Sequence, residues 1–180
     1  WWSTRYPLLH QQSQADCGAT CLAMLAQYWG RSYSLNFLRE LAHVGLSGAG
    51  LTSLAKAAEA IGFQARPVRA SLVPLKNQNP WIAHWQGNHY VVVYRCQGNR
   101  LLVADPAKSR SWVSEKTFLA NWTGYALLLD PTPQFYKASH PQPTGLTFQH
   151  FLSLLWPQRH TIGQIILASL MIQVFGLIAP

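Results

Sequence analysis

The chain has 180 residues, enough for one domain and a remainder but not for two large domains, since domains most often run to about 100–150 residues. Hydrophobic residues make up 49% and charged residues only 11%, well below the roughly 25% of ordinary soluble proteins, which excludes intrinsic disorder. Lys and Arg outnumber Asp and Glu by 14 to 6 but are scattered singly, so no nucleic-acid-binding tract is present and no nucleic-acid partner is expected.

The cysteines and the start of the chain indicate its compartment. Cys17, Cys21 and Cys96 are an odd and small number for a secreted disulfide scaffold, so free thiols in a reducing compartment are expected. No basic segment followed by an apolar one opens the chain, and its first residue is Trp1. We therefore expect a cytoplasmic fragment or trimmed product that is not itself an export substrate.

The first sixty residues show helical spacing of apolar side chains. Asp16 is expected to cap a helix over residues 17–29. Two further helices are expected, one over residues 34–42 and one from a Thr52 cap to Gly62.

Beyond residue 80 the hydrophobic period changes from 3.6 to 2, which is typical of strands. The expected strands cover residues 81–85, 89–96, 100–105 and 125–129. A short helix that starts after Ser114 and reaches Trp122 separates the last two. Helices first and an antiparallel sheet second predict an α+β fold over residues 1–130.

The composition changes near residue 130. Residues 131–147 are rich in proline and are expected to form a linker. Residues 148–156 then show the amphipathic spacing of a helix that lies at a membrane interface.

The last twenty residues, 161–180, contain no Asp, Glu, Lys or Arg, and about twenty apolar residues span one bilayer. We expect residues 148–180 to be an amphipathic lead-in and the first transmembrane helix of a larger membrane protein, with Arg159 on the cytoplasmic side. The alternative is a buried core helix, which the polar Gln164 and Gln173 favour.

Cys17 is the strongest candidate for a nucleophile. It follows the capping aspartate at the first turn of a helix, where unpaired backbone N–H groups and the helix dipole favour a thiolate. Cys21 lies one turn later among apolar residues and Cys96 lies in mid-strand, so both are expected in the core.

A thiol nucleophile needs an imidazole and a group that orients it. Of seven histidines, His84 and His89 lie on predicted strands, and His89 opens its strand at a sheet rim. A three-residue loop over residues 97–99 would place Asp105 diagonally across from His89 on the same face. A two-residue turn would instead shift the register by one and turn Asp105 to the opposite face. The sequence therefore predicts a Cys17–His89–Asp105 triad that depends on this hairpin.

Three segments carry a family resemblance. They are Gln11-Gln12-Ser13-Gln14-Ala15-Asp16-Cys17-Gly18-Ala19-Thr20-Cys21, His89-Tyr90-Val91-Val92-Val93 and Asp105-Pro106. Together they resemble the bacteriocin-processing, double-glycine leader peptidase domains at the N-termini of bacterial peptidase-containing ABC exporters. The resemblance covers residues 5–130 and implies a papain-like cysteine peptidase fold.

The resemblance also implies roles and partners. Gln11 would be the glutamine of the oxyanion hole, beside the catalytic Cys17, His89 and Asp105. The substrate would be the leader of a ribosomally made peptide, cut after a Gly-Gly pair, and the bulky side chains around Trp81, Trp85 and Tyr90 are available to line a pocket for it. The chain would belong to an inner-membrane exporter, a homodimer through its transporter domains, with the peptidase domain in the cytoplasm.

No Gly-x-x-x-x-Gly-Lys-Ser/Thr motif occurs in the sequence. We therefore expect no cofactor and no metal in this chain, with ATP and Mg bound only by a nucleotide-binding domain elsewhere in the exporter. Two other functions stay open. One is a non-catalytic domain that docks the leader, which the presence of Cys17 disfavours; the other is a membrane-anchored thiol amidase or transglutaminase-like enzyme.

Overall fold

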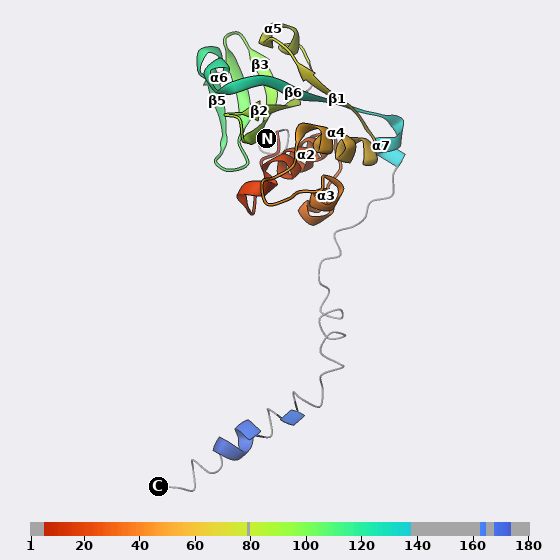
Figure 1. The fold of residues 1–180 in the computed structure, drawn as a ribbon, viewed down its shortest axis with the longest axis vertical. Helices are drawn as coiled ribbons and strands as arrows, with labels where there is room; N and C mark the ends of the chain where they lie inside the picture. Colours follow the sequence, from red (N-terminus) through yellow and green to blue (C-terminus); the bar gives the residue numbers. More distant parts are fainter. Residues whose placement is uncertain (1–5, 79, 138–162, 165–167, 174–180) are drawn as a thin grey trace. The chain divides into compact units, whose positions relative to one another are not determined.

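The computed structural model describes residues 6–78, 80–137, 163–164 and 168–173 (Figure 1). The chain divides into two compact units, Trp1–Gln142 and Pro143–Pro180. In the part of the chain that the structure describes, no helix combines the length and apolar character needed to cross a bilayer. Most of the expected span over residues 161–180 lies outside the described residues, and the expected boundaries at 130 and 147 stay predictions.

The N-terminal part is helical, as predicted. A short 3-10 helix, η1 (Gln14–Asp16), leads directly into α2 (Cys17–Tyr28), and α3 (Leu35–Leu41) and α4 (Leu51–Ala60) follow. Figure 1 shows α2, α3 and α4 together on one side of the sheet.

Neither helix cap predicted for this part of the chain is correct, and the side-chain cap of α3 was not predicted. Ser34 caps α3, because its hydroxyl accepts a hydrogen bond from the Phe37 N–H at 3.3 Å. The expected Thr52 cap is wrong, since α4 starts after Gly50. Asp16 holds the N-cap position of α2 but makes no side-chain bond to that helix, so its expected capping role is wrong as well.

The strands form one antiparallel sheet in the order β1-β6-β2-β3-β4-β5 (Figure 1). They are β1 (Phe63–Arg69), β2 (Trp81–Trp85), β3 (His89–Gln97), β4 (Arg100–Ala104), β5 (Arg110–Ser114) and β6 (Trp122–Pro131). Within residues 6–137 the remaining helices are α5 (Leu72–Leu75), α6 (Glu115–Asn121) and α7 (Pro133–Lys137), and the described residues 163–164 and 168–173 are helical as well. The predicted α+β class and four strands are confirmed, whereas β1 and β5, the two edge strands, were not predicted.

Alternate residues of β3 enter two different cores. Tyr90, Val92 and Tyr94 pack on the helical side with α2, α3 and α4. Val91 and Val93 pack on the other side with the aromatic residues of β2, α6 and β6. Because both faces of this strand are covered, the first residue of β3 stands at the rim between helix and sheet.

Two glycines are required by close packing. A Cβ on Gly18 would lie 2.7 Å from a methyl carbon of Leu54, so its absence lets α4 approach the first turn of α2. Gly62 has a φ of +96°, and a Cβ there would lie 2.5 Å from the backbone nitrogen of Phe135.

Candidate active site

The Cys17 thiol lies at the start of α2 and is 4% exposed. It is a free thiol, as are Cys21 and Cys96. The helix N-terminus favours negative charge at this position through its unpaired N–H groups. The helix packs against β3, which brings the thiol to the strand that begins with His89.

His89 and Asp105 are in direct contact. The His89 Nε2 lies 2.8 Å from the Asp105 Oδ1, which confirms the expected proximity of the two side chains. Asp105 is held from its own loop, because its Oδ1 also accepts the Ala107 N–H at 2.9 Å. With Nε2 bound to the carboxylate, Nδ1 is the ring nitrogen available to Cys17.

The contact arises by a different route from the one predicted. The β3–β4 hairpin has the two-residue turn, with Gln97 paired to Arg100. That register alone would turn Asp105 away. An irregularity between Val93 and Arg95 inserts one extra residue, so that Val93 pairs with Val103 and the register beyond it is the one predicted for a three-residue loop.

The inserted residue, Tyr94, has a structural use. Its hydroxyl donates a hydrogen bond to the Pro7 carbonyl at 2.6 Å, and its ring packs against Tyr6 and Tyr28. The bulge therefore also anchors the segment that leads to Gln11.

The surroundings of His89 favour its charged form. Burial of the ring disfavours the imidazolium, but the hydrogen bonds and charges of Asp105 and Cys17 outweigh it and raise the pKa of His89 to about 9. Burial also raises the pKa of Asp105, whereas the hydrogen bonds from His89 and Ala107 and the charges of His89 and Lys108 lower it below the usual range. An imidazolium at His89 beside a carboxylate at Asp105 is the charge state that these contacts support.

Gln11 is tied to the same loop. Its backbone N–H donates to the Pro106 carbonyl at 3.0 Å, directly after Asp105. Its side-chain Oε1 is buried and has no hydrogen-bond partner among the described residues. A buried polar atom of this kind is costly unless a ligand or solvent group satisfies it. The amide therefore lies where it can serve a bound molecule.

The side chains of Gln11, His89 and Asp105 border a cleft of about 390 Å³. Its lining includes Gln11 and Gln14 from the segment before α2 and Leu46 from the loop after α3. His89 and Trp85 also line it. Of the aromatic residues proposed to line a pocket, Trp85 borders this cleft, but Trp81 is 1% exposed and packs on Phe118 and Trp122 in the second core.

A second cavity of about 460 Å³ lies next to the following residue of β3, Tyr90. Its wall includes the apolar side chains of Leu51, Val68 and Tyr125. Burial and then the charge of Cys17 raise the pKa of Tyr90 to about 12, so the thiol lies in electrostatic reach of this cavity too. His89 and Asp105 thus line an amide-rich cleft, and the next residue of β3, Tyr90, lines a second cavity.

The other candidate side chains are engaged elsewhere. His84 Nδ1 lies 2.9 Å from the Thr123 hydroxyl, and burial lowers the pKa of this histidine. Cys21 is fully buried in the core, as predicted, and burial raises the pKa of its thiol. Cys96 is only partly buried, with its pKa raised by burial as well. Both cysteines are poor thiolates.

Arg39 is a contributor that the sequence did not reveal. Its guanidinium donates hydrogen bonds from two nitrogens to the buried Asp16 carboxylate, one of them at 2.6 Å. The same carboxylate also accepts the Ser13 N–H at 2.7 Å. The Arg39 hydrogen bonds hold the pKa of Asp16 at about 2. Asp16, the residue directly before Cys17, is therefore tied to α3 through Arg39, and it is not part of the predicted triad.

Fold and site together define an α+β cysteine peptidase architecture in which one imidazole contacts both a thiol and a carboxylate. The chain belongs to the Peptidase C39 family, whose model matches residues 5–134. The family predicted from the motifs is confirmed.

Relatives and solved structures agree with this assignment. The chain is 29% identical to the colicin V secretion/processing ATP-binding protein CvaB of Escherichia coli, over 99% of this chain and 26% of that protein. It is 34% identical to the transport/processing ATP-binding protein ComA of Streptococcus pneumoniae, over 93% of this chain and 24% of that protein. It therefore spans about a quarter of the length of these relatives.

Two solved structures cover the peptidase part. The peptidase domain of Streptococcus ComA, a bi-functional ABC transporter, matches with a TM-score of 0.67 and 32% identity over 71% of this chain and 99% of that one. A double glycine motif protease from an AMS/PCAT transporter, solved in complex with the leader peptide, matches with a TM-score of 0.67 and 31% identity over 70% and 91%.

Proposed function

We propose that this chain is the cysteine peptidase of an exporter and removes the leader of a ribosomally made peptide by cutting after a Gly-Gly pair. The observation that carries the proposal is that His89 contacts both Asp105 and the Cys17 thiol, on a cleft that Gln11 also lines, in a chain of the Peptidase C39 family. The names of its relatives and the leader complex of a similar protease support the substrate class.

In the first step the Cys17 thiolate attacks the carbonyl carbon of the second glycine. The oxygen of that carbonyl becomes an oxyanion, and Gln11 donates a side-chain N–H to it, an interaction worth typically about 2.7–4 kcal/mol. The C–N bond then breaks. His89 gives its Nδ1 proton to the departing amine, and a thioester between Cys17 and the leader remains.

In the second step His89 takes a proton from water, and the resulting hydroxide attacks the thioester. The C–S bond breaks, the leader leaves with a carboxylic acid at its second glycine, which then loses its proton to the solvent, and Cys17 is a thiolate again beside the imidazolium. Asp105 keeps the imidazole in one orientation and stabilises its charge in both steps.

The chemistry also sets the direction of the bound peptide. Because His89 protonates the departing amine, the released peptide lies on the His89 side of the thiol. The leader lies on the other side, where the cavity beside Tyr90 offers apolar walls. A channel too narrow for any Cβ at the two positions before the cut would select glycine by steric exclusion of other residues.

The remaining properties follow the exporter assignment. We propose that the transporter containing this chain lies in the inner membrane as a homodimer with the peptidase domain in the cytoplasm, and that ATP and Mg are bound by its nucleotide-binding part. The relatives, which are named as transport and ATP-binding proteins about four times as long, support this proposal. Of the other two functions, leader docking alone gives no reason for the His89–Asp105 contact, and no observation favours a small amide substrate.

The test uses a synthetic precursor with an amphipathic leader ending in Gly-Gly, followed by mass spectrometry of the products. The wild-type chain should yield one cut after the second glycine. Cys17→Ala should abolish cleavage but keep leader binding, because the thiol makes bonds in the reaction and few in the ground state. Cys21→Ala is the matched control and should cut when folded; equal loss of turnover in it would show that Cys17 is not the nucleophile. An uncut precursor would overturn the proposed activity.

A further inference from the structure

The described cleft extends well beyond the reacting atoms on the His89 side. From His89 it continues to Gln86 and Asn88 in the β2–β3 turn and to Lys108 in the loop after Asp105. None of these three residues takes part in the proposed cleavage. The departing amine must lie next to His89 to receive its proton, so the first residues of the released peptide have to occupy this space.

Few of the residues that line this part of the cleft carry a charge. Of the described residues that line it, His89, Asp105 and Lys108 carry charge, and the first two form the catalytic pair. The side chains around them are neutral amides and small or apolar groups, Gln14 and Gln86 among them. Among the described residues that line the cleft, Lys108 is therefore the one cation that forms no salt bridge with a carboxylate.

We infer that the cleft beside His89 binds the first residues of the peptide that leaves, and that Lys108 makes it favour an acidic residue there over a basic one. The inference rests on the proposed function, since it concerns the residues after the cut. The buried Gln11 Oε1, which lacks a partner in the described part of the chain, is an acceptor for a backbone N–H of the same peptide.

Two further observations support the role of Lys108. Its backbone N–H donates to the main-chain carbonyl of Asp105 at 3.0 Å, so the loop that carries it is fixed to the backbone of the residue whose carboxylate contacts His89. Its positive charge also contributes to the lowered pKa of Asp105, which puts the ammonium in electrostatic reach of the catalytic pair.

The order of the two reaction steps predicts which of them depends on the charge of the released peptide. The released peptide departs when the thioester forms, so its charge can affect acylation but not the hydrolysis of the thioester. An exposed ion pair contributes little free energy, but exchanging an acidic for a basic residue replaces attraction by repulsion. We expect an acylation rate about three- to tenfold higher for the acidic substrate at low salt, with the difference reduced at high salt.

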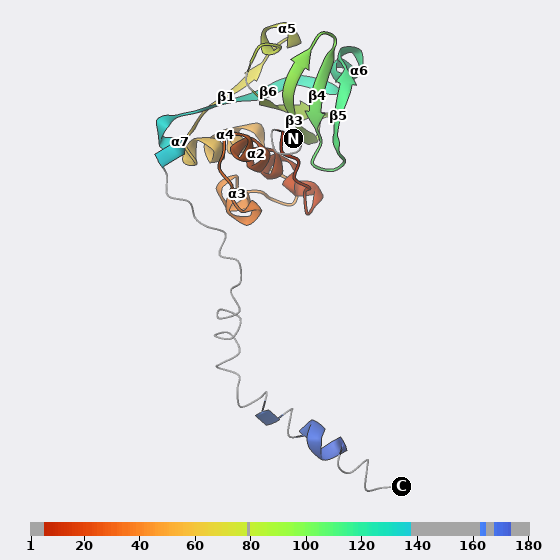
Figure 2. The ribbon, with the colours of Figure 1, turned by 180° about the vertical axis from the view of Figure 1, so that it is seen from behind.

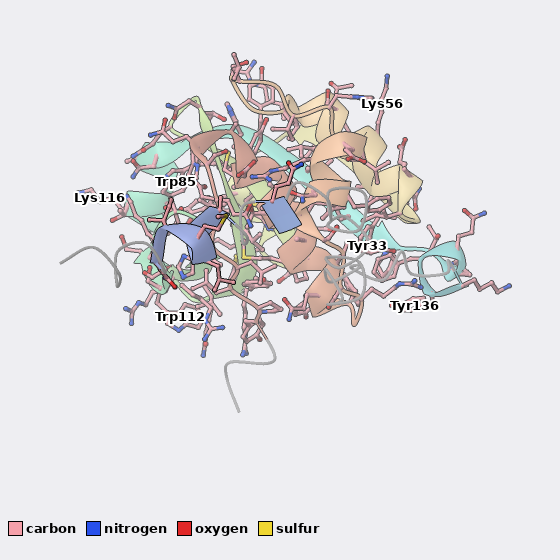
Figure 3. All side chains as sticks on the ribbon, turned by 90° about the horizontal axis from the view of Figure 1, so that it is seen from below. Tyr33, Lys56, Trp85, Trp112, Lys116 and Tyr136 are labelled. Carbon is pink, nitrogen blue, oxygen red and sulfur yellow. The ribbon has the colours of Figure 1, made fainter. Side chains whose placement is uncertain are left out.

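The experiment uses the 180-residue chain and three precursors that differ only in the residue after Gly-Gly: Glu, Gln or Lys. Single-turnover acylation and thioester hydrolysis are measured separately for each. Lys108→Glu should reverse the preference, and Lys108→Gln should remove it. Lys56→Glu is the control for net charge, because Lys56 is exposed on α4 and lies far from Trp85 in Figure 3.

The outcomes separate the two proposals. If no precursor is cut by the wild-type chain, the proposed function fails and the inference falls with it. If all three precursors are cut equally fast by wild type and Lys108→Glu, the proposed function stands and the inference is overturned. A preference that appears in thioester hydrolysis, or that Lys56→Glu changes as much as Lys108→Glu does, would also overturn the assignment to Lys108.

Discussion

Asp105→Asn is the substitution whose effect the structure predicts in most detail. The Asp105 Oδ1 lies 2.8 Å from His89 Nε2, and the pKa of His89 is about 9 in place of its ordinary 6.5. At about 1.36 kcal/mol per pKa unit, this difference corresponds to roughly 3 kcal/mol in favour of the imidazolium. The side chains are only 18% and 15% exposed, so solvent screens the interaction weakly.

Removing the charge should move the alkaline limb of the pH–rate profile. Cleavage needs a protonated His89 to supply the departing amine, so kcat/KM of the wild-type chain should fall as the pH rises through about 9. If the pKa of His89 returns to 6.5, the fraction of the protein with a protonated His89 drops about thirtyfold at pH 8. At pH 6 the same fraction changes by less than about twofold. Asp105→Asn should therefore lose most activity at the alkaline end.

Stability supplies a readout that does not depend on turnover. A histidine whose pKa is raised on folding contributes stability below its unfolded pKa of 6.5, and the contribution is lost as the pH rises through about 9. The free energy of unfolding in urea should decline over that range in the wild-type chain and much less in Asp105→Asn. Asp130→Asn, at the exposed ion pair with Arg66, is the control. An alkaline limb that stays near pH 9 in Asp105→Asn would refute the reasoning.

Two further substitutions test the packing around Cys17. Arg39→Gln should lower the free energy of unfolding by about 2.5 kcal/mol at pH 7, since Asp16 titrates at about 2 against 3.8. Because the pKa of Asp16 is lowered on folding, this contribution is present above pH 3.8 and lost as the pH falls through about 2, so an equal loss at every pH would contradict it. Gly18→Ala should cost about 1–3 kcal/mol, because its Cβ would meet Leu54 at 2.7 Å. The double variant Gly18→Ala/Leu54→Ala should lose less than the sum of the single variants, and strict additivity in urea unfolding would disprove the clash.

The sequence by itself identified the catalytic candidates and the order of most elements. Helical spacing from Cys17 onward and the period of 2 through β2 and β3 are local patterns, and each reflects one element packing one or two faces against a core. Cys17 and Gln11 stand in one short motif, so their proximity needed no long-range information. The placement of His89 at a strand start likewise followed from the turn before it.

The edge strands show where local patterns end. β1 contains Pro67 and pairs only with β6, and β5 pairs only with β4 (Figure 2). Strands at the border of a sheet have partly exposed faces, so their side chains follow no strict alternation. Hydrogen bonding to the neighbouring strands β6 and β4 makes β1 and β5 strands, and this pairing cannot be read from the local sequence.

Only the tertiary structure decided the register of the site. The turn between β3 and β4 has the length that would have separated Asp105 from His89, and the bulge at Tyr94 restores their contact. Nothing in the spacing of residues 89–105 distinguishes a two-residue turn with a bulge from a three-residue turn. The bulge is held by Tyr94 packing on the N-terminal segment and bonding to Pro7, far away in the chain.

The same holds for Asp16, whose local position suggests a helix cap but whose charge is satisfied by Arg39, 23 residues later. Contacts between distant segments are set by packing in three dimensions, and a linear pattern carries only their local consequences.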